Sequence, residues 1–370
     1  MKTVKLGDVL EKTSTIKWRE RPQDHIYSYV DLTSVDRSRH EIIQTSKINA
    51  KNAPSRAQKI IKTDDVLFGT TRPTLNRLCI VPGEYDEQIC STGFCVLRAN
   101  TDLVTPSFVY YLLTTKAFVE YVEATQRGTS YPAVTDKDVK QFEFVLPSLE
   151  EQKKIVERLD AAFKKISAAE VLMRRNLDNV AMLQKSILHK YLSVSDSART
   201  HRFEDIISLV RPKEKLQQKQ FLSEGSYPII SQEASFINGY WNDQTILIED
   251  NGPLVVWGDH TTVVKYVDFP FVAGADGTKI FKPIHGIDTK WLYYWLLANP
   301  IDKLGYARHY RILKASIVSV PSIETQLKAV KAVDSVFART DKLIKKFEYK
   351  LDKISDLRQS LLQQAFSTTK

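Results

Sequence analysis

Several short strings in the chain look like fragments of active sites, but each one lacks a part that the chemistry needs. Asn299-Pro300-Ile301-Asp302 approaches the Asn/Asp-Pro-Pro-aromatic motif of a DNA amino-methyltransferase, yet it lacks the second proline and the aromatic residue. Gly274–Lys279 has the wrong glycine spacing for a phosphate-binding loop. The seven histidines and three cysteines form no cluster with zinc-ligand spacing. We therefore expect no catalytic residue, no metal ligand and no cofactor in this chain.

Polar loops that could bind nucleic acid are better represented. Guanidinium, amide and hydroxyl groups bond phosphates and base edges in DNA, and they gather at 69–77, 126–131, 257–262 and 308–311. For each loop the alternative is a solvated turn, and Trp257 and Tyr310 could simply pack in a core. The residues expected to contact DNA are Thr70, Thr71, Arg72, Asn76, Arg77, Arg127, Thr129, Ser130, Tyr131, Trp257, His260, Thr261, Arg308, His309, Tyr310 and Arg311.

The composition agrees with an acidic partner. The 370 residues carry a formal net charge of +9 with a pI near 9.2, and nucleic acid is the commonest acidic partner of basic chains. Cys79, Cys90 and Cys95 are odd in number and lack metal or redox spacing, which predicts an intracellular chain without disulfides. Neither an apolar signal region nor a run of about 18 apolar residues occurs, so we expect a cytoplasmic chain without membrane contact.

A long internal repeat indicates the elements that must position these loops. Segments 147–193 and 321–367 align without a gap at an offset of 321 − 147 = 174 residues. Pro147, Ser148, Glu150, Gln152 and Asp160 are among the residues that recur at the shifted position. A repeat of this length indicates a duplicated structural unit.

Each copy of the repeat is predicted to be one long helix with a heptad pattern. The first stripe is expected at Leu159, Ile166, Met173, Val180 and Ile187, and in the second copy at Val333, Thr340, Phe347, Ile354 and Leu361, with a polar exception at Thr340. The partner stripe is expected at Ala162, Ala169 and Leu183, and at Val336, Leu343 and Leu357. Such a repeat predicts a helix that packs against another helix, and about 45 residues make a rod of roughly 65 Å. The alternative is two amphipathic helices in an ordinary core.

The two helices are expected to begin differently. Ser148 and Glu151 have the spacing of a capping box, in which each side chain bonds the other residue's backbone N–H. The second copy keeps Pro321-Ser322 but has Thr325 where the box needs glutamate.

Residues 1–146 and 194–320 are each predicted to form a globule of mixed α/β structure. In the first, strands are expected at 27–32, 65–70, 78–81, 93–97 and 142–146, with helices at 107–115 and after Thr135. In the second, strands are expected at 229–230, 245–248, 254–257, 262–267 and 279–281. Trp291–Leu296 echoes Phe108–Leu113, so the globules are distantly related to each other. The polar stretch 193–200 is expected to connect the first helix to the second globule.

This order of globule, helix, globule, helix resembles the specificity (S) subunit of type I restriction-modification systems. The motifs that carry the resemblance are PSLEEQ at 147–152 with the helix up to Asp160, LQKSIL at 183–188, and the second copies at 321–326 and 357–366. The DDVLF strand at 64–68, before Arg72, is also similar to the target-recognition domains of that family. The resemblance covers essentially the whole chain.

The resemblance implies an architecture and a set of partners. Two mixed α/β target-recognition domains, 1–146 and 194–320, would be separated by two long antiparallel coiled-coil helices, 147–193 and 321–370. Each domain would read one half of a split sequence in double-stranded DNA, and helix length would set the spacer. Two methyltransferase subunits would dock on the helices, and a motor-endonuclease subunit would join for cleavage. S-adenosylmethionine, ATP and Mg²⁺ would belong to those partners, so this chain would supply recognition without catalysis.

Three other functions remain open at this point. One globule could be a small nuclease built from scattered carboxylates and a lysine. The chain could be a coiled-coil scaffold that does not contact DNA. It could also be the specificity subunit of a modification-only system.

Overall fold

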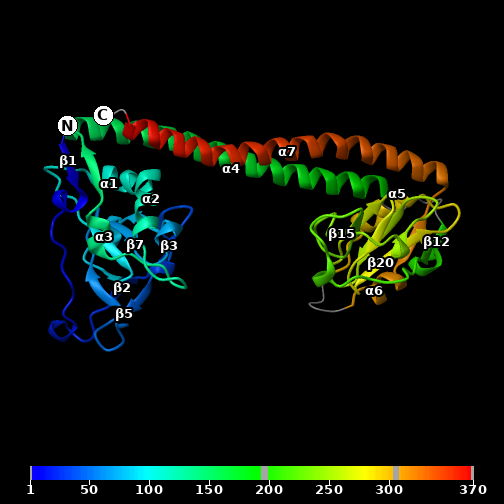
Figure 1. The fold of residues 1–370 in the computed structure, drawn as a ribbon, viewed down its shortest axis with the longest axis horizontal. Coiled ribbons are helices and arrows are strands. Elements are labelled where there is room, and N and C mark those ends of the chain that lie inside the picture. The colour runs from blue at the N-terminus through cyan, green and yellow to red at the C-terminus, as the bar shows by residue number, and fades with distance from the viewer. Residues whose placement is uncertain (1, 193–198, 303–307, 368–370) are drawn as a thin grey trace. The chain divides into compact units, whose positions relative to one another are not determined.

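The computed structural model describes residues 2–192, 199–302 and 308–367, so most of the connection expected at 193–200 lies outside the described residues. The chain divides into two compact units (Figure 1). Unit 1 comprises Met1–Leu172 and Tyr349–Lys370, and unit 2 comprises Met173–Glu348. Each unit thus joins one of the expected globules to part of both expected helices.

The globule of unit 1 contains two small sheets and a short hairpin. The first sheet has the order β5-β2-β9-β6, with β2 (Tyr27–Val30), β5 (Ser46–Ile48), β6 (Ala57–Ile60) and β9 (Ile89–Ser91). The second has the order β10-β7-β8, with β7 (Val66–Gly69), β8 (Leu78–Ile80) and β10 (Phe94–Leu97). The hairpin pairs β3 (Val35–Asp36) with β4 (Glu41–Ile42). The strands expected in this globule at 27–32, 65–70, 78–81 and 93–97 are confirmed.

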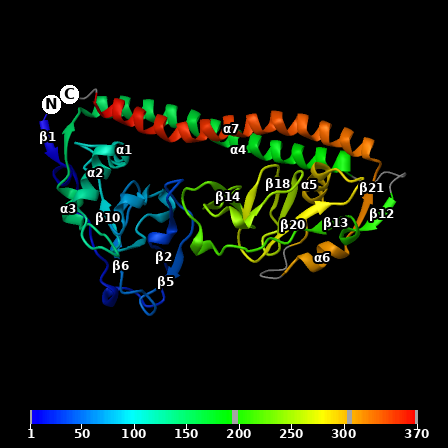
Figure 2. The same ribbon diagram turned by 45° about the vertical axis from the view of Figure 1, so that its right-hand side comes forward.

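The helices of this globule are α1 (Pro106–Thr114), α2 (Lys116–Thr125) and α3 (Asp136–Lys140). The expected caps are present: the Thr105 hydroxyl accepts the Phe108 N–H, and Thr135 forms a capping box with Asp138. Helix α2 was not predicted. Helix α1 lies between the rest of the globule and the long helices (Figure 2). In the core of the globule the rings of Phe68 and Phe118 contact each other, and Phe108 of α1 packs against Phe366 near the end of the chain.

The globule of unit 2 repeats this plan. One sheet has the order β15-β14-β19-β16, with β14 (Tyr227–Ile230), β15 (Gly239–Trp241), β16 (Leu247–Ile248) and β19 (Phe271–Ala273). The other has the order β13-β20-β17-β18, with β13 (Ile207–Leu209), β17 (Leu254–Gly258), β18 (Val264–Val267) and β20 (Thr278–Pro283). Its helices are α5 (Thr289–Ala298) and α6 (Tyr310–Ala315).

The pairing pattern confirms that the globules are related. In each four-stranded sheet that contains a parallel pair, that pair is central: β2 with β9 in unit 1, and β14 with β19 in unit 2. In the other sheet, β7 and β17 each lie between two antiparallel neighbours. The expected echo of Phe108–Leu113 in Trp291–Leu296 corresponds to α1 and α5.

A two-stranded ribbon joins each globule to its long helix. In unit 1, β1 (Lys2–Lys5) pairs antiparallel with β11 (Glu143–Leu146), which leads directly into the first long helix. In unit 2, β12 (Arg199–Arg202) pairs antiparallel with β21 (Ile317–Val320), which leads into the second. The first and last strands of each globule therefore lie together beside the start of a long helix.

The two long helices are confirmed as α4 (Leu149–Leu192), with 44 residues, and α7 (Ile323–Ser367), with 45. At the start of α4, Ser148 N–H donates to Glu151 Oε2 at 2.9 Å and Glu151 N–H donates to Ser148 Oγ at 3.3 Å, which completes the predicted box. At the start of α7, the Ser322 hydroxyl still accepts the Thr325 N–H at 3.3 Å. Thr325 replaces the missing glutamate with a hydroxyl contact to Ser322 at 3.0 Å.

Within each unit the helices pack antiparallel. In unit 1, Ile155 and Leu159 near the start of α4 share a core with Leu362 and Ala365 near the end of α7. In unit 2, Leu188 and Leu192 near the end of α4 share a core with Ala329 and Val333 near the start of α7. The predicted polar exception, Thr340, is buried, and its hydroxyl accepts a hydrogen bond from Gln184 Nε2 at 2.8 Å.

The predicted partner stripe is wrong at Leu183, Leu343 and Leu357, whose side chains are 44–47% exposed. At two of these places the next residue faces the other helix: Gln184 bonds Thr340, and Arg358 donates to Ser167 Oγ at 3.0 Å. An α-helix drifts by about 20° per heptad against a strict seven-residue repeat. Over several heptads this drift moves the contact to the following position, which a fixed sequence period does not follow.

Candidate nucleic-acid interface

The two predicted loops of unit 1 come together through backbone hydrogen bonds. Arg72 N–H donates to the Pro132 carbonyl at 2.6 Å, and Val134 N–H donates to the Thr70 carbonyl at 3.0 Å. Arg127 and Ala133 exchange two backbone hydrogen bonds of 2.9 Å. Segments 70–72 and 126–127 therefore flank segment 132–134. Residues that lie more than 50 positions apart in the sequence form one surface.

The exposed side chains of this surface can both donate and stack. Arg72, Arg127, Thr129 and Ser130 are exposed, and Tyr131 is 73% exposed. The Arg72 guanidinium lies over the Tyr131 ring at 5.2 Å from its centre. Arg127 forms a 3.3 Å ion pair with Asp138 but keeps a 71% exposed side chain. Guanidinium and hydroxyl groups in this arrangement can bond phosphates or base edges, and the aromatic ring can stack on a base.

Backbone conformation explains why these loops project. Arg72 and Asn76 both adopt left-handed conformations, with φ of 50° and 49°, on either side of a short 3-10 turn at Pro73–Leu75. Gly128 has φ of +96°, which favours glycine, and an added Cβ would lie 3.1 Å from the Tyr131 carbonyl. The left-handed residues turn the chain sharply after β7.

The other predicted contact residues of unit 1 are buried or partly buried, and most of them form hydrogen bonds that hold the loop in place. Thr70 is buried, and its hydroxyl donates to the Gly93 carbonyl at 2.9 Å. The Arg77 guanidinium donates to the Leu32 carbonyl, and the Arg77 carbonyl accepts Gly69 N–H at 2.7 Å. The backbone of Thr71 pairs antiparallel with that of Ala133, through the hydrogen bonds that Arg72 and Val134 donate. Asn76 is partly buried, and its Oδ1 is shielded from solvent and accepts no hydrogen bond from any residue that the structure describes.

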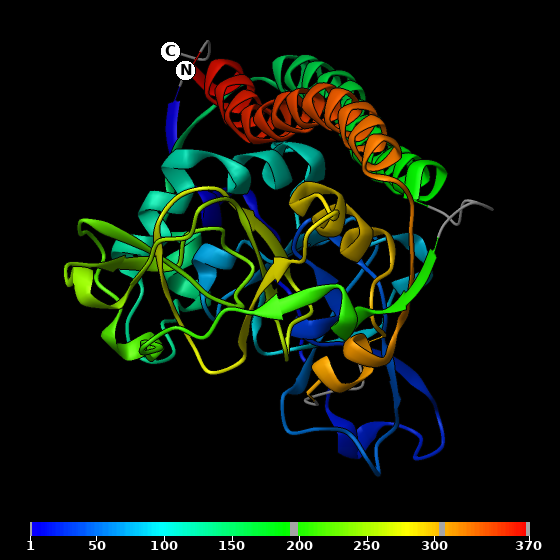
Figure 3. The ribbon, with the colours of Figure 1, turned by 90° about the vertical axis from the view of Figure 1, so that its right-hand side faces the viewer.

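The predicted loop at 257–262 meets segment 308–311, and Asp259 joins them. The prediction of a loop at 308–311 is wrong in part, because Tyr310 and Arg311 belong to helix α6. The Asp259 carbonyl accepts His309 N–H at 2.9 Å, and Asp259 Oδ1 accepts Tyr310 N–H at 2.8 Å. Asp259 N–H donates to the Gly277 carbonyl at 2.7 Å. The loop after β17 is thereby tied to the start of α6, which lies on the side of the globule away from the long helices (Figure 3).

The predicted residues of unit 2 divide into packed and exposed groups. Trp257 is 2% exposed and packs against Phe281, with Tyr310 at 6.3 Å between ring centres, as the packing alternative expected. His309 is fully buried, with Nδ1 2.9 Å from the Asp259 carbonyl. Arg308 and Arg311 are exposed. The partly buried residues are His260, Thr261 and Tyr310.

Sequence reasoning missed the residues that hold this second surface together. Thr261 Oγ1 donates to the Gln232 carbonyl at 2.5 Å, and His260 N–H donates to Gln232 Oε1 at 3.3 Å. An added Cβ on Gly258 would lie 2.1 Å from Thr261 Oγ1, so the loop needs glycine there. The Trp257–Thr262 string contained Gly258 and Asp259, but Gln232 lies 25 positions upstream of Trp257 and gave no local signal.

Each globule is attached to its long helix by the same side chains in equivalent positions. The Gln152 amide accepts Thr105 N–H at 2.9 Å and donates to the Leu103 and Pro147 carbonyls at 2.9 and 3.0 Å. Gln326, which is Gln152 shifted by 174 positions, accepts Asp288 N–H at 2.8 Å and donates to the Gly286 and Pro321 carbonyls at 3.1 and 2.9 Å. Thr105 and Asp288 are the N-caps of α1 and α5.

A tyrosine and an aspartate form a second attachment about two turns further along each long helix. Tyr111 donates to Asp160 in unit 1, and Tyr294 donates to Asp334 in unit 2. Burial, followed by this hydrogen bond, raises the pKa of both tyrosines above the usual value. The attachments match although the exposed loops of the two globules differ.

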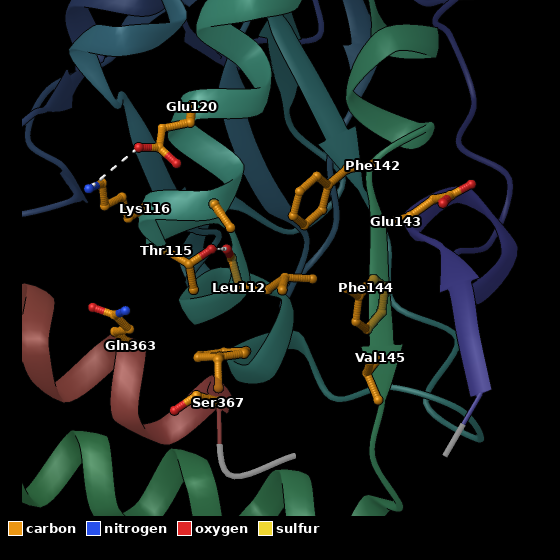
Figure 4. A pocket seen from close by; sticks show the side chains of 12 residues that line it. Leu112, Thr115, Lys116, Glu120, Phe142, Glu143, Phe144, Val145, Gln363 and Ser367 are labelled. Carbon is orange, nitrogen blue, oxygen red and sulfur yellow. Dashed lines mark hydrogen bonds and ion pairs between the residues drawn. The ribbon is translucent and has the colours of Figure 1, made fainter. Parts of the chain in front are cut away.

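A hollow in unit 1 lies away from the predicted loops. It has a volume of about 440 Å³ and lies between α1, β11 and the end of α7 (Figure 4). Its walls include Leu112, Phe142, Phe144 and Gln363, and none of the predicted contact residues lines it. We therefore exclude it from the candidate interface.

The described residues contain no group of three or more histidine, cysteine or acidic residues placed to hold a metal ion. The three cysteines are free and buried, and burial raises the pKa of the Cys79 and Cys95 thiols to about 12. A thiol with so high a pKa is a poor nucleophile near neutral pH. Among the described helices, none is both long and apolar enough to cross a bilayer.

Comparison with sequences of known proteins points to one family. Residues 1–171 match the family model described as type I restriction modification DNA specificity domain. The HindI specificity subunit of Haemophilus influenzae is 32% identical over 111 residues, which cover 30% of this chain and 24% of that protein. The chain thus matches the first curated relatives over less than a third of their length. The EcoDI specificity subunit of Escherichia coli is 22% identical over 71% of this chain and 70% of that protein.

Solved structures extend the match over nearly the whole chain. A chain from a study of assembly and conformational transition of the type I R-M system has a TM-score of 0.85 and 26% identity, covering 99% of this chain and 97% of that one. The HsdS subunit of Thermoanaerobacter tengcongensis has a TM-score of 0.61 and 25% identity, with coverage of 99% and 96%. Residues 1–171 thus match the DNA specificity domain of this family, and the whole chain shares the fold of type I restriction-modification specificity subunits.

Proposed function

We propose that this chain is the non-catalytic subunit that recognises DNA in a type I restriction-modification complex. The globule of unit 1 reads one half of a split target in double-stranded DNA, and the globule of unit 2 reads the other half. The observation that carries this proposal is the contrast between matched attachments and different exposed loops. Gln152 and Gln326 make the same three hydrogen bonds, whereas the loops offer Arg72 and Tyr131 in one unit and Arg308 and Arg311 in the other.

The base-reading residues in this proposal are the exposed ones. Thr70, Trp257 and His309 are buried and could reach DNA only if the core around them opened. Opening a packed core to expose a buried aromatic residue costs several kcal/mol. The proposal therefore assigns contact with DNA to Arg72, Arg127, Thr129, Ser130 and Tyr131 in unit 1, and to Arg308 and Arg311 in unit 2.

The long helices in this proposal dock the catalytic partners. Several large apolar side chains on them are exposed, among them Val171, Leu172 and Met182, which are 57–67% exposed. Exposed apolar side chains on a helix pair support docking of further helices. The proposed partners are two methyltransferase subunits, which use S-adenosylmethionine, and a motor-endonuclease subunit, which uses ATP and Mg²⁺. The complex would work in the cytoplasm.

Sequencing of methylated sites tests the function. Cells would express this chain with its methyltransferase partner, with and without the motor subunit. We expect methyladenine at a single split motif whose two halves are separated by a fixed number of unspecified bases. Exchange of residues 194–320 for those of a relative should change one half of the motif and keep the other. Methylation that keeps its motif after this exchange would contradict the assignment of one half-site to each globule.

Binding assays separate this function from the alternatives. The purified complex should bind its target duplex, with affinity falling as salt rises because phosphate contacts release counterions. A scaffold would show no salt-dependent binding to duplex DNA. A nuclease would cut DNA as the isolated chain with Mg²⁺ or Mn²⁺, and we expect no cleavage. Methylation of the target in the native host without cleavage of unmethylated target DNA would indicate a modification-only system.

A further inference from the structure

Unit 2 contains a basic cavity that the predicted loops do not include. Its volume is about 550 Å³, and it lies between the segment that follows β13 and the loop that leads into β20. Four cationic side chains line it: Arg211, Lys213, Lys215 and Lys279. The acidic residues in its wall are Glu214 and Asp276, so positive charge exceeds negative charge there by two.

The cations belong to a fixed framework. Lys215 Nζ donates to the Thr278 carbonyl at 2.6 Å and to the Asp276 carbonyl at 3.3 Å, which joins the two walls. Leu216 N–H donates to the Ala273 carbonyl at 3.0 Å, and Ala275 N–H donates to the Leu216 carbonyl at 2.8 Å. The cavity is therefore formed by the fold before any ligand arrives.

Two of the cations lie close enough to repel each other. Burial, and next the charge of Lys279, lower the pKa of Lys215 below the usual value of lysine. Lys279 lies 3.8 Å from Asp259 Oδ2, which is a loose contact, and its ammonium lies 5.4 Å from the centre of the Tyr310 ring. Arg211 is exposed and has no ion-pair partner among the described residues. An anion in the cavity would relieve this repulsion.

The cavity adjoins the candidate DNA-binding surface of the same unit. Lys279 is paired with Trp257 across β20 and β17, and Asp259 contacts both Lys279 and the start of α6. The loop at 274–279 was rejected as a nucleotide-binding loop because of its glycine spacing. In the structure it instead contributes Asp276, Thr278 and Lys279 to the cavity wall.

Unit 1 does not repeat this cation set. On the strand that matches β20, Cys95 stands where Lys279 stands in unit 2, because Cys95 pairs with Phe68 of β7 as Lys279 pairs with Trp257 of β17. Arg98 is neutralised by two hydrogen bonds of 2.7 and 2.8 Å to Asp65. The basic cavity is thus a feature of one globule, although both share a topology.

We propose that this cavity binds a phosphate group of the DNA backbone beside the half-site read by unit 2. The inference rests on the proposed function and adds to it a backbone contact that positions the duplex without reading a base. Phosphate contacts fix the register of a protein on DNA but carry no sequence information directly. A free phosphate compound has the same ligand chemistry, so the test must distinguish the two sources.

The test uses the complete complex with its partners and a duplex that carries the methylated motif. Arg211→Gln and Lys279→Gln each remove one cavity charge, and Lys282→Gln is the matched control. Lys282 lies on the same strand as Lys279 but is ion-paired with Asp250 outside the cavity. Lys215 is left unchanged because its hydrogen bonds hold the walls together.

We expect each cavity variant to bind the duplex about three- to fivefold more weakly, as for one partly exposed ion pair. The slope of log K against log salt should fall in magnitude by about 0.9 per lost phosphate contact. The ratio of affinities for the target and for a mutated half-site should not change. In ethylation interference, one phosphate position beside the second half-site should lose its effect in Arg211→Gln and keep it in Lys282→Gln.

Three outcomes would overturn the proposal that the cavity binds a DNA backbone phosphate. Wild-type affinity, slope and interference pattern in both cavity variants would overturn the phosphate contact while leaving the DNA-reading function intact. A changed affinity ratio would mean that these side chains read bases. Calorimetric binding of inorganic phosphate or ATP that Arg211→Gln abolishes, with DNA binding unchanged, would assign the cavity to a free phosphate compound. Failure of the wild-type complex to bind any duplex would instead contradict the proposed function.

Discussion

At the scale of single residues, Arg72 combines a constrained backbone with an exposed guanidinium. Its N–H is fixed to the Pro132 carbonyl and its side chain lies over the exposed Tyr131 ring. A guanidinium that is already oriented by an aromatic ring loses less conformational freedom on binding. Arg72 is therefore our leading candidate for a base contact in unit 1.

Replacement of Arg72 by alanine should weaken binding to the full target by roughly 1–3 kcal/mol if the guanidinium reads a base edge. The loss should disappear on a duplex whose first half-site is already mutated, because the contact is then absent in both proteins. Fluorescence anisotropy with matched duplexes measures both. Arg39→Ala removes the same charge from an exposed residue of the β3–β4 hairpin and serves as the control. Equal losses in both variants would indicate general electrostatics instead of base reading.

Arg311 allows base reading to be separated from phosphate binding in unit 2. We expect Arg311→Ala to weaken binding by roughly 1–3 kcal/mol and to relax sequence preference only at the second half-site. Lysine keeps the charge but cannot form the two parallel hydrogen bonds of a guanidinium. Arg311→Lys should therefore fail to restore sequence preference, as judged by methylation of a library of half-site variants. Full restoration by lysine would assign Arg311 to the backbone.

The residues also show where sequence reasoning stops. The sequence predicted polar segments that the structure brings together in pairs, because hydroxyl, amide and guanidinium groups follow β-rich segments, but it took the start of α6 for a loop. It could not separate Arg72, which is exposed, from Thr70, which is buried two positions earlier. That difference arises from hydrogen bonds to distant partners, such as the Gly93 carbonyl for Thr70 and Gln232 for the loop of Thr261. Neither partner lies near its loop in the sequence.

At the scale of elements, the long helices were predictable and their contact positions were not. The absence of glycine and proline, the heptad pattern and the Ser148–Glu151 box predicted α4 to within a few residues at each end. The same pattern placed Leu183 and Leu357 in the contact, where the structure has Gln184 and Arg358. Helix α2 was missed although Thr115 caps it, because no proline follows Thr115 as Pro106 follows Thr105. Helix α6 was missed because its N-cap, His309, makes no side-chain cap.

The helix contact seen in the structure predicts a large loss of stability for one leucine of α4 and a small loss for another, five positions away. Leu188 is 7% exposed and packs with Val333, whereas Leu183 is 47% exposed. Leu188→Ala should lower the free energy of unfolding by about 2–5 kcal/mol, the usual cost of emptying a core position. Leu183→Ala should lower it by less than about 1 kcal/mol. Urea denaturation followed by circular dichroism measures both losses. A larger loss for Leu183→Ala than for Leu188→Ala would support the contact stripe that the sequence predicted.

At the scale of the whole molecule, the repeat explains why both halves of the chain are built alike. Ile155 and Leu159 meet Leu362 and Ala365 in unit 1, and their counterparts Ala329 and Val333 meet Leu188 and Leu192 in unit 2. Each half-contact therefore uses the start of one repeat copy and the end of the other. Because both copies of the repeat contribute equivalent residues to this helix contact, deletion of equivalent residues from both copies should preserve it.

That property allows helix length to be tested as the determinant of the spacer. Residues 170–176 and 344–350 occupy equivalent positions in the two copies, since 344 − 170 = 174. Deletion of both heptads shortens each helix by about 10 Å at ~1.5 Å per residue and shifts the phase of the helix contact by only about 20°. DNA rises roughly 3.4 Å per base pair, from one turn of 34–36 Å in about 10 base pairs.

If helix length sets the distance between half-sites, the doubly deleted chain should prefer a spacer about three base pairs shorter. The half-sites themselves should remain the same, because the globules are unchanged. Methylated-site sequencing in cells that express the deleted chain with its partners measures both quantities. Deletion of only one heptad misaligns the two copies, so that variant should lose stability and methylation and serves as the control. An unchanged spacer in a folded, active double deletion would show that partner subunits, and not these helices, fix the distance.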